Sequence, residues 1–369
     1  MPNTSQNARF SELLAVNEAS TDSAESTADL LKVIYEFASY DGPLKFNCTR
    51  AWWFFGTGLL LIAGAVALFC YIDTYQVVSF FRRLQIEPGL VGAVTGVLGI
   101  GFAIGSMKWM KSKADRLPSL SRKIAALSSY FHNRLMFLEE NSHCTLHELD
   151  TQFGDYRRGN YSRELVESLE GVFTGKLRDL PYHYRHLHYV NKRTEQVTVT
   201  DKDGKTRTET RVVYDHYDRY SLVFDFPWIT GISVRSDNQS ENDYSWSMDT
   251  ASPDFKKSFC LTGQSEILCA KFIKPSTVLH LLKLFEILDR PNLEFSDDGL
   301  FCLSFASSDL LAFGTEYSLA SPNEFYVEIA AGVKLPRLKS VLQWCHALSE
   351  LHDDNFTFTA SPPNKCKEK

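Results

Sequence analysis

Two long apolar segments constrain this chain more than any other feature. The first runs from Ala51 to Ile72 and the second from Gly89 to Met107, and neither contains a charged residue. As α-helices rising about 1.5 Å per residue they would reach roughly 33 and 28 Å, close to the roughly 30 Å hydrocarbon core of a bilayer. The sequence therefore predicts a transmembrane helical hairpin.

The rest of the chain has the composition of a folded, water-soluble protein. Of the 369 residues, 44% are hydrophobic and 23% are charged, and 26 Phe and 16 Tyr can fill a core. This favours one or two ordinary domains over a disordered tail. The net charge of −6 gives no reason to expect a nucleic-acid partner, and no motif indicates a cofactor.

The N-terminal sequence and the cysteines both bear on location. The first residues lack the basic start and early apolar run of a signal peptide, so we expect the first apolar segment to remain as an anchor. The eight cysteines are scattered and form no CxxC pair. Scattered cysteines are typical of compartments that keep thiols reduced, which predicts a cytosolic soluble portion.

Basic residues predict the orientation of the hairpin, because Lys and Arg concentrate on the cytoplasmic side of membrane helices. The turn between the segments, residues 73–88, holds only Arg82 and Arg83. Eight basic residues flank the other ends: Lys45, Arg50, Lys108, Lys111, Lys113, Arg116, Arg122 and Lys123. We therefore expect both termini in the cytoplasm. Lys108, Lys111, Lys113 and Arg116 are expected to contact anionic lipid headgroups, at about 1 kcal/mol per basic residue.

Glycines in the second apolar segment predict close helix packing. Gly92 and Gly96 are four residues apart, as are Gly101 and Gly105. Small residues at this spacing lie on one helix face and let another backbone approach. The partner could be the first segment, a second copy of the chain or another membrane protein. A gated pore is disfavoured, since neither segment has an ionisable residue to line one.

We expect five parts along the chain: a flexible segment with one short helix (1–50), the helical hairpin (51–108), a juxtamembrane helical region (109–180), an α+β domain (181–352) and a flexible tail (353–369). Residues 1–26 are rich in polar and small residues, and a helix begins near Thr27. Apolar spacing predicts further helices over Leu117–Asn141, Leu146–Phe153 and Ser162–Leu177.

Alternating residues then predict strands. Pro181–Val199 and Lys205–Trp228 alternate on either side of Asp203-Gly204, which is a strong hairpin signal. The polar tip of this hairpin is expected to project into solvent. A polar loop follows over 236–252. The remaining elements are expected to be strands at Phe255–Leu261, Ile267–Ile273 and Phe325–Ile329, a tight hairpin of Leu293–Phe295 with Leu300–Phe305, and helices at Pro275–Asp289 and Leu335–Leu351. The fold class is thus α+β, with antiparallel hairpins.

The soluble portion offers one cluster of metal-ligating residue types. It comprises His183, His186, His188, Asp215, His216 and Asp218, on the two arms of the first hairpin. His and carboxylate can bind zinc or iron, but histidines on a half-exposed strand explain the same pattern, and we assign no metal site. Cys345 and His346 adjoin on an expected helix, where neighbours point about 100° apart, which disfavours a catalytic pair. No catalytic or phosphate-binding motif occurs in the soluble portion.

A series of hydrophobic patterns follows the two apolar segments and the basic helix. It contains Phe255 and Phe259, then Phe272–Pro275, Val278–Leu284 and the hairpin Leu293–Phe305. Together with Tyr220–Val234, this order resembles the bacterial membrane proteins grouped as domain of unknown function 3137. The similarity covers 117–313, while the charged tip near Gly204 and the polar loop 236–252 depart from it. The family has no established activity, so the resemblance implies a place, the bacterial inner membrane, and no reaction.

These observations favour an inner-membrane protein that displays a cytosolic α+β domain for binding or scaffolding and is not an enzyme. Its expected partners are the lipid bilayer and either a second copy or another membrane protein. One alternative is a membrane-anchored, metal-dependent enzyme that uses the histidine-rich hairpin. The other is a subunit of a transport, secretion or defence complex.

Overall fold

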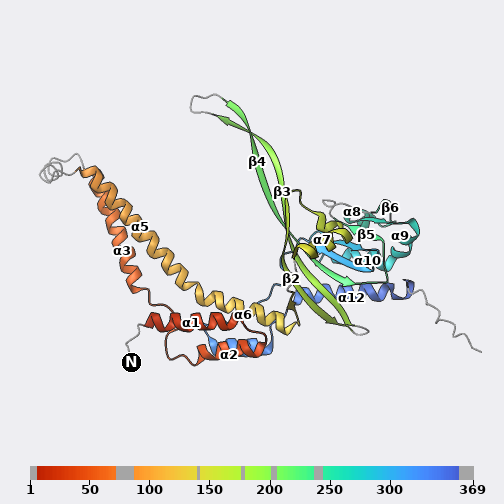
Figure 1. The fold of residues 1–369 in the computed structure, drawn as a ribbon, viewed down its shortest axis with the longest axis horizontal. Helices are drawn as coiled ribbons and strands as arrows, with labels where there is room; N and C mark the ends of the chain where they lie inside the picture. Colours follow the sequence, from red (N-terminus) through yellow and green to blue (C-terminus); the bar gives the residue numbers. More distant parts are fainter. Residues whose placement is uncertain are drawn as a thin grey trace, which may run out of the picture. The chain divides into compact units, whose positions relative to one another are not determined.

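The computed structural model describes residues 6–71, 87–138, 142–175, 179–200, 206–236 and 244–356 (Figure 1). Within them the fold is α+β, as the sequence predicts, with two long apolar helices early in the chain and a nine-stranded antiparallel sheet. The chain divides into two compact units. The helical unit holds the residues up to Ser129 together with Gly314–Val333, and the sheet unit holds Tyr130–Phe313 and the residues from Lys334 onward.

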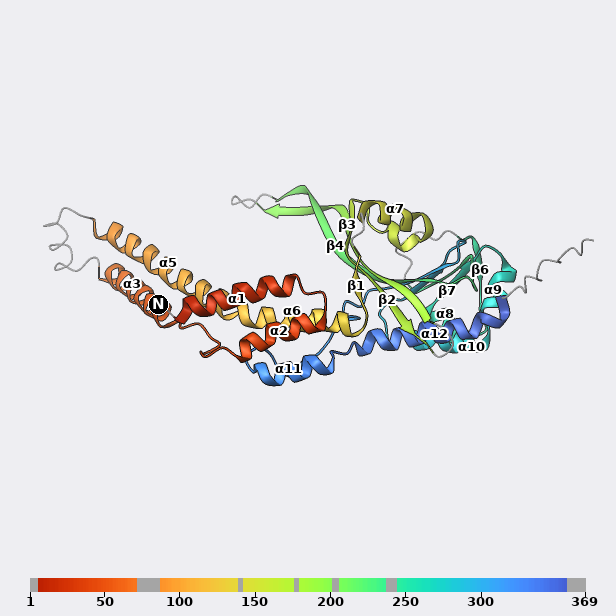
Figure 2. The same cartoon turned by 60° about the horizontal axis from the view of Figure 1, so that its bottom comes forward.

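The helical unit combines segments from both ends of the chain. Its elements are α1 (Gln6–Asp22), α2 (Thr27–Ala38), α3 (Thr49–Cys70), α5 (Pro88–Ala114), most of α6 (Arg116–His132) and α11 (Pro322–Ala331). Although α11 is almost 300 residues later in the sequence, it packs on α2 (Figures 1 and 2). Phe325 and Ile329 are four residues apart and lie buried on one face of α11. The strand predicted over these residues is therefore wrong.

Helix α1 corrects the expectation that residues 1–26 are flexible. The buried side chains of α1 recur every three or four residues, at Phe10, Leu14, Asn17 and Thr21. Two of these buried residues are polar, so the spacing of apolar residues in the sequence does not predict the helix. Asn17 Nδ2 donates a hydrogen bond to Glu36 Oε2 on α2, at 2.9 Å. That bond satisfies a polar group inside the helix contact, as buried polar groups require.

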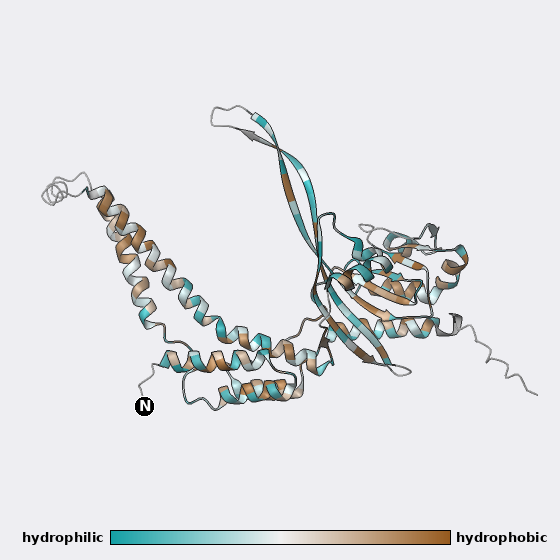
Figure 3. Cartoon of the chain, in the orientation of Figure 1, coloured by the Kyte–Doolittle hydropathy of each residue, from teal (hydrophilic) through white to brown (hydrophobic). Residues whose placement is uncertain are grey.

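The two apolar helices α3 and α5 pack on each other (Figure 1). They approach most closely at Gly58 and Gly99, where the backbones meet. A Cβ atom added at Gly58 would lie 2.7 Å from the carbonyl oxygen of Gly99, and one at Gly99 would lie 2.8 Å from that of Gly58. Only glycine permits this approach. Figure 3 shows apolar residues over most of α3 and over the first two thirds of α5, with hydrophilic residues at the start of α3 and the end of α5.

All nine strands of the sheet unit pair antiparallel, in the order β1-β2-β3-β4-β9-β8-β5-β7-β6. The strands are β1 (Met136–Phe137), β2 (Ser162–Thr174), β3 (Asp179–Thr200), β4 (Thr206–Asp225), β5 (Ile232–Arg235), β6 (Trp246–Met248), β7 (Cys260–Gly263), β8 (Asn292–Phe295) and β9 (Leu300–Phe305). The other elements of the sheet unit are α7 (Ser142–Gln152), the 3-10 turn η1 (Gly154–Arg157), α8 (Pro253–Ser258), α9 (Glu266–Phe272), α10 (Pro275–Leu284) and α12 (Pro336–Phe356).

The two faces of the sheet have different chemistry. Alternate residues of a strand point to opposite faces. One face carries aromatic and aliphatic side chains such as Tyr184, Leu222 and Phe301, and they form the main core with α8, α9, α10 and α12. The other face carries buried polar and charged side chains, which lie close to α7 and η1. The predicted hairpin of Leu293–Phe295 and Leu300–Phe305 is confirmed, and so is the pairing of β3 with β4.

Strand β2 corrects the helix predicted over Ser162–Leu177. Leu165 and Leu169 are four residues apart, and this spacing resembles a helix face. In the structure the ladder shifts register between Leu165 and Glu167, so that Leu165 opposes Leu187 and Leu169 opposes Tyr184. This β-bulge changes the face that the following residues present. Both leucines are buried, but they belong to different cores on opposite sides of the sheet.

Three other boundaries differ from the sequence prediction. Residues 267–273 fall mainly in helix α9 instead of a strand, because Ser265 caps the helix by accepting a hydrogen bond from the Leu268 amide. The strand expected from Phe255 begins only at Cys260, after α8. The helix expected over 117–141 ends at His132, and Arg134 then adopts a positive φ of 55° before β1. The turn 73–88, the tip at 203–204 and the tail after Phe356 lie almost wholly outside the described residues.

His352, near the end of α12, packs against α9 and α10, and its protonation would oppose folding. His352 is fully buried, stacks on Phe272 with ring centroids 5.1 Å apart, and places Nε2 3.2 Å from Thr277 Oγ1. Burial, together with the nearby charges of Lys274 and His280, lowers the pKa of His352 to about 4.

We predict that this histidine weakens the fold in acid. Between pH 6.5 and about 4 the unfolded chain binds a proton that the folded chain excludes, so stability falls as the pH decreases through this window. From pH 7 to pH 5 the loss should be about 2 kcal/mol. The substitution His352→Gln should remove most of it, whereas His147→Gln, at an exposed side chain, should not. Urea unfolding of the full chain in detergent at the two pH values measures both, and an equal pH dependence in the two variants would contradict the prediction.

Candidate functional site

The structure separates the four glycines that the sequence groups as a packing motif. Gly92 and Gly96 face α3: a Cβ atom added at Gly92 would lie 3.0 Å from the Phe69 ring, and one at Gly96 would lie 3.5 Å from Ala65. At Gly101 and Gly105 an added Cβ would meet nothing within 4 Å. The contact with α3 therefore uses Gly92 and Gly96 but not the later pair.

Helical geometry explains this division. Each residue advances by about 100°, so five residues from Gly96 to Gly101 turn the helix by about 140° away from the contact. Gly99, three residues after Gly96, stays on the contact face and makes the closest approach. Gly58 and Gly99 are thus the packing glycines that the four-residue spacing missed. A mixed spacing of four and three would have identified Gly99.

The four basic residues expected at lipid headgroups have different environments. Lys108 and Lys111 are exposed on α5, and the Lys113 ammonium lies 5.0 Å from the centroid of the Phe46 ring. Arg116 instead pairs with Glu18 on α1, with Nη2 2.6 Å from Oε2 and Nε 3.1 Å from Oε1. This pair holds α1 against the start of α6, and the lipid contact expected of Arg116 stays a prediction.

The hairpin brings together one part of the histidine-rich cluster. His186, His188, His216 and Asp218 lie on the same face of β3 and β4, and Asp218 Oδ1 is 2.9 Å from His186 Nε2 and 3.0 Å from His188 Nδ1. His188 Nε2 is 3.1 Å from His216 Nδ1. His183 and Asp215 point to the opposite face, as the alternation of a strand requires.

This cluster has the character of a polar surface network. Partial burial raises the pKa of Asp218, but hydrogen bonds from His188 and His186 outweigh it, so the pKa lies below its ordinary value. The ring of His186 also stacks on Tyr220, with centroids 4.5 Å apart. Among the described residues, no group of three His, Cys, Asp or Glu side chains is arranged to hold a metal ion.

Cys345 and His346 point in different directions, as their adjacency on a helix predicts. Cys345 is fully buried in the main core, and burial raises the pKa of its thiol well above the ordinary value. His346 lies instead against Phe173, and its Nδ1 is 3.5 Å from Glu350 Oε1. A buried, protonated thiol without an adjacent base is a poor nucleophile.

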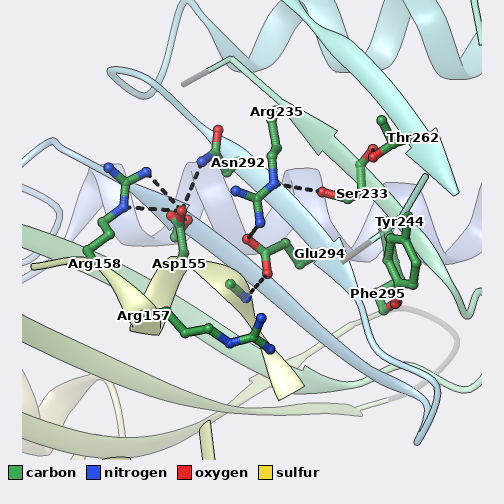
Figure 4. A network of polar contacts seen from close by, with 12 residues as sticks. Asp155, Arg157, Arg158, Ser233, Arg235, Tyr244, Thr262, Asn292, Glu294 and Phe295 are labelled. Atoms are coloured by element: carbon green, nitrogen blue, oxygen red, sulfur yellow. Dashed lines mark hydrogen bonds and ion pairs between the residues drawn. The ribbon is translucent and has the colours of Figure 1, made fainter. Parts of the chain in front are cut away.

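The polar face of the sheet contains a buried ionic network that the sequence did not reveal (Figure 4). Its centre is Asp155, which is fully buried in η1. Asp155 Oδ1 accepts hydrogen bonds from Arg158 Nη2 at 2.8 Å and Asn292 Nδ2 at 3.0 Å. Its Oδ2 accepts from Arg219 Nε at 2.9 Å and from the Ser304 hydroxyl.

A second buried ion pair lies beside this network on the same face (Figure 4). Arg235 of β5 donates through Nη2 to Glu294 Oε1 of β8 at 2.6 Å, and through Nε to Ser233 at 3.0 Å. Glu294 Oε2 also accepts the backbone amide of Gly154, at 2.7 Å. Gly154 and Asp155 are adjacent in η1. The two ion pairs together therefore fix η1 onto β4, β5, β8 and β9.

The arrangement of these groups indicates a structural role. Both carboxylates accept hydrogen bonds from arginine, amide or hydroxyl donors, and the nearby Tyr156 hydroxyl is 2.6 Å from Ser221 Oγ. Burial raises the pKa values of Tyr156 and Cys302 well above their ordinary range. Tyr156 and Cys302 therefore stay protonated at neutral pH, and the two carboxylates stay bound to their donors. None of these groups is poised to act as an acid, base or nucleophile.

Sequence reasoning missed this network because its members are far apart in the chain. Asp155 meets Arg219, Asn292 and Ser304 only through the strand order, across separations of up to 149 residues. One local signal existed: polar residues recur at alternate positions of the strands, as at Asn292 and Glu294. This pattern indicates a second, polar sheet face but not which partners meet on it.

Comparison with protein-family models, curated proteins and solved structures finds no match to this chain. The resemblance to domain of unknown function 3137 therefore stays a prediction.

We predict that Asp155→Asn destabilises the sheet unit by about 3–5 kcal/mol, because Arg158 and Arg219 would remain buried without their shared carboxylate. The matched control is Asp289→Asn. Asp289 pairs with Arg290 at an exposed position, 3.5 Å apart, where a surface ion pair contributes at most about 1 kcal/mol. Chemical unfolding of the full chain in detergent, followed by tryptophan fluorescence, measures both changes. Equal unfolding midpoints for the two variants would contradict a structural role for Asp155.

Proposed function

We propose that this protein is an integral membrane protein that holds its α+β sheet unit at the cytoplasmic surface, where the sheet unit acts by binding and not by catalysis. The observation that carries the proposal is the exposed apolar surface of α3 and α5. Both helices are long and apolar enough to cross a membrane.

The side chains on these helices argue for a lipid environment. Leu60 on α3 is 74% exposed and Val97 on α5 is 70% exposed. Many other large apolar side chains on the two helices are also exposed: Trp52, Trp53, Phe54, Leu59, Val66, Phe69, Leu90, Val94, Leu98, Ile100, Phe102, Ile104 and Met107. A contiguous apolar surface of this extent is unfavourable in water and is typical of a membrane or protein interface. The core helix of a soluble protein would bury these residues instead.

The dimensions and the charges support a helical hairpin across the bilayer. The 22 residues of α3 span roughly 33 Å, which matches the hydrocarbon thickness. Helix α5 begins with apolar residues and ends with Lys108, Lys111 and Lys113. The excess of basic residues outside the 73–88 turn favours both termini in the cytoplasm, and the resemblance noted above favours the bacterial inner membrane.

Binding is the activity that the sheet unit supports best. The buried ionic groups of its polar face are engaged with one another, so they serve the fold. Beyond the register pair Val190–His216, β3 and β4 pair only with each other among the described residues and continue as a two-stranded ribbon to Thr200–Thr206 (Figure 1). A two-stranded ribbon is marginally stable in water by itself, and its unpaired edges are templates for further strand pairing.

The ribbon presents two different faces to solvent. One face carries charges that pair within the ribbon, as where Arg193 bonds Asp215 and Glu195. The other face is neutral and rich in threonine, with these residues at opposed positions: Thr194, Gln196, Thr198, Thr208, Thr210 and Val212. Because this neutral face needs no charged partner, it suits contact with another protein chain, including a second copy.

We predict that the chain stays in the membrane fraction after extraction with alkaline carbonate and leaves it only in detergent. Reporter fusions after residue 356 should be active in the cytoplasm, whereas a reporter inserted within residues 73–86 should be active outside it. The substitution Leu60→Arg should reduce insertion, at a cost of about 2.5–3.5 kcal/mol for a charge near the helix centre. Leu60→Ile is the matched control. A full chain that remains monodisperse in buffer without detergent would overturn the proposal.

We predict that shortening the ribbon removes binding without unfolding the sheet unit. The change joins Thr194 to Val212 by an Asn-Gly turn, which suits a two-residue hairpin. The melting temperature should change by only a few degrees, because the ribbon lies outside both cores. Size and composition of the complex purified in mild detergent measure the binding. A wild-type chain that purifies as a bare monomer would contradict a binding function, and an unchanged complex in the shortened variant would exclude the ribbon as its contact.

A further inference from the structure

The helical unit contains a cavity of about 490 Å³ beside the apolar helix pair. It lies between the start of α3 and the second half of α5, next to the first residues of α1. Its lining residues are Asn7, Asn47, Arg50, Ala51, Phe54, Gly101, Phe102, Gly105, Ser106 and Trp109. This volume is within the range of small-molecule sites, about 300–1,000 Å³.

The wall on α5 is hollow because two positions lack side chains. Gly101 and Gly105 are one helical turn apart, and a Cβ atom at either position would meet nothing within 4 Å. The rings of Phe54 and Phe102 stand beside them in parallel, with centroids 6.0 Å apart and planes 7° from parallel. The glycines that do not pack on α3 thus line an apolar cavity instead.

The other end of the cavity is polar and cationic. Arg50 has no carboxylate partner within the described part of the chain, and no acidic residue lines the cavity. The side chain of Asn7 holds this end in place, since its Nδ2 donates to the Asn47 carbonyl at 2.9 Å and its Oδ1 accepts from the Asn47 amide at 2.7 Å. Lys108, which is exposed on α5 and directly precedes the lining residue Trp109, adds a further positive charge.

We propose that this cavity binds one anionic phospholipid, with an acyl chain along Gly101 and Gly105 and the phosphate at Arg50. The proposal rests on the membrane insertion proposed above. The cavity combines an apolar wall with an unpaired guanidinium, so it matches a molecule with an apolar tail and an anionic head. Arg recognises phosphate by charge-assisted hydrogen bonds. Trp109 also lines the cavity, and tryptophan is enriched at the level of lipid headgroups.

The test uses the full chain in nanodiscs of phosphatidylcholine alone or of equal parts phosphatidylcholine and phosphatidylglycerol. Native mass spectrometry after release counts the retained lipids. The wild type should keep one phosphatidylglycerol in preference to phosphatidylcholine. Arg50→Gln should weaken this preference about tenfold, because the charge-assisted hydrogen bond between the guanidinium and the phosphate would be lost. Gly105→Leu should exclude the lipid by filling the cavity.

Gly64→Leu is the matched control, because Gly64 on α3 also has nothing within 4 Å of an added Cβ but does not line the cavity. Equal lipid retention in Gly105→Leu and Gly64→Leu would overturn the proposal, and so would equal retention of the two lipids by the wild type. Gly105→Ala gives a milder second variant if the leucine variant fails to fold. Carbonate extraction of every variant separates failure of the lipid site from failure of membrane insertion.

Two further outcomes would also overturn the proposal. If soluble glycerol phosphate displaces the retained lipid as well as short-chain phosphatidylglycerol does, the site recognises the phosphate alone. If Gly105→Leu abolishes a cross-linked dimer of the wild type while lipid retention stays unchanged, the glycine surface contacts a second copy of the chain instead.

Discussion

The apolar surface of α3 and α5 is the constraint on which the rest of this protein depends. The two helices bury only a narrow strip against each other, around Gly58 and Gly99, and their remaining apolar side chains need an environment other than water. In a bilayer this surface is satisfied, and the same bilayer then fixes which parts of the chain lie at its surface. The lipid site that we propose beside Gly101 and Gly105 depends on that setting, because an acyl chain is available to fill the cavity only in a bilayer.

The sheet unit meets a different constraint, because its long antiparallel sheet has two faces to cover. The helices α8, α9, α10 and α12 cover one face with an ordinary apolar core. The opposite face is held by Asp155, Glu294 and their arginines, whose ion pairs tie η1 across several strands. Buried pairs of this kind resist disruption more than they add net stability. Through these contacts they hold η1 against β4, β5, β8 and β9 on the face opposite the apolar core.

Basic residues that look equivalent in the sequence have separate roles in the structure. Arg116 joins α6 to α1 through Glu18, and Lys113 lies over the ring of Phe46. Arg50 has no carboxylate partner in the described residues and is one of the residues that line a cavity. A count of positive charges predicts orientation, because orientation depends on the sum of the charges. It does not distinguish a cation that is already neutralised from one that is available to a ligand.

The sequence alone determined the elements whose signals are local: two apolar helices, the paired arms around Asp203-Gly204, the Leu293–Phe305 hairpin and the α+β class. Only the tertiary structure decided the elements that depend on distant partners. Helix α11 forms against α2, β2 changes face through a bulge against β3, and Asp155 collects donors from three separate strands. Periodicity within a short window records which side of a segment is apolar. It contains no information about which distant segment supplies the other half of a contact, and that pairing selects the core, the buried charges and the cavity.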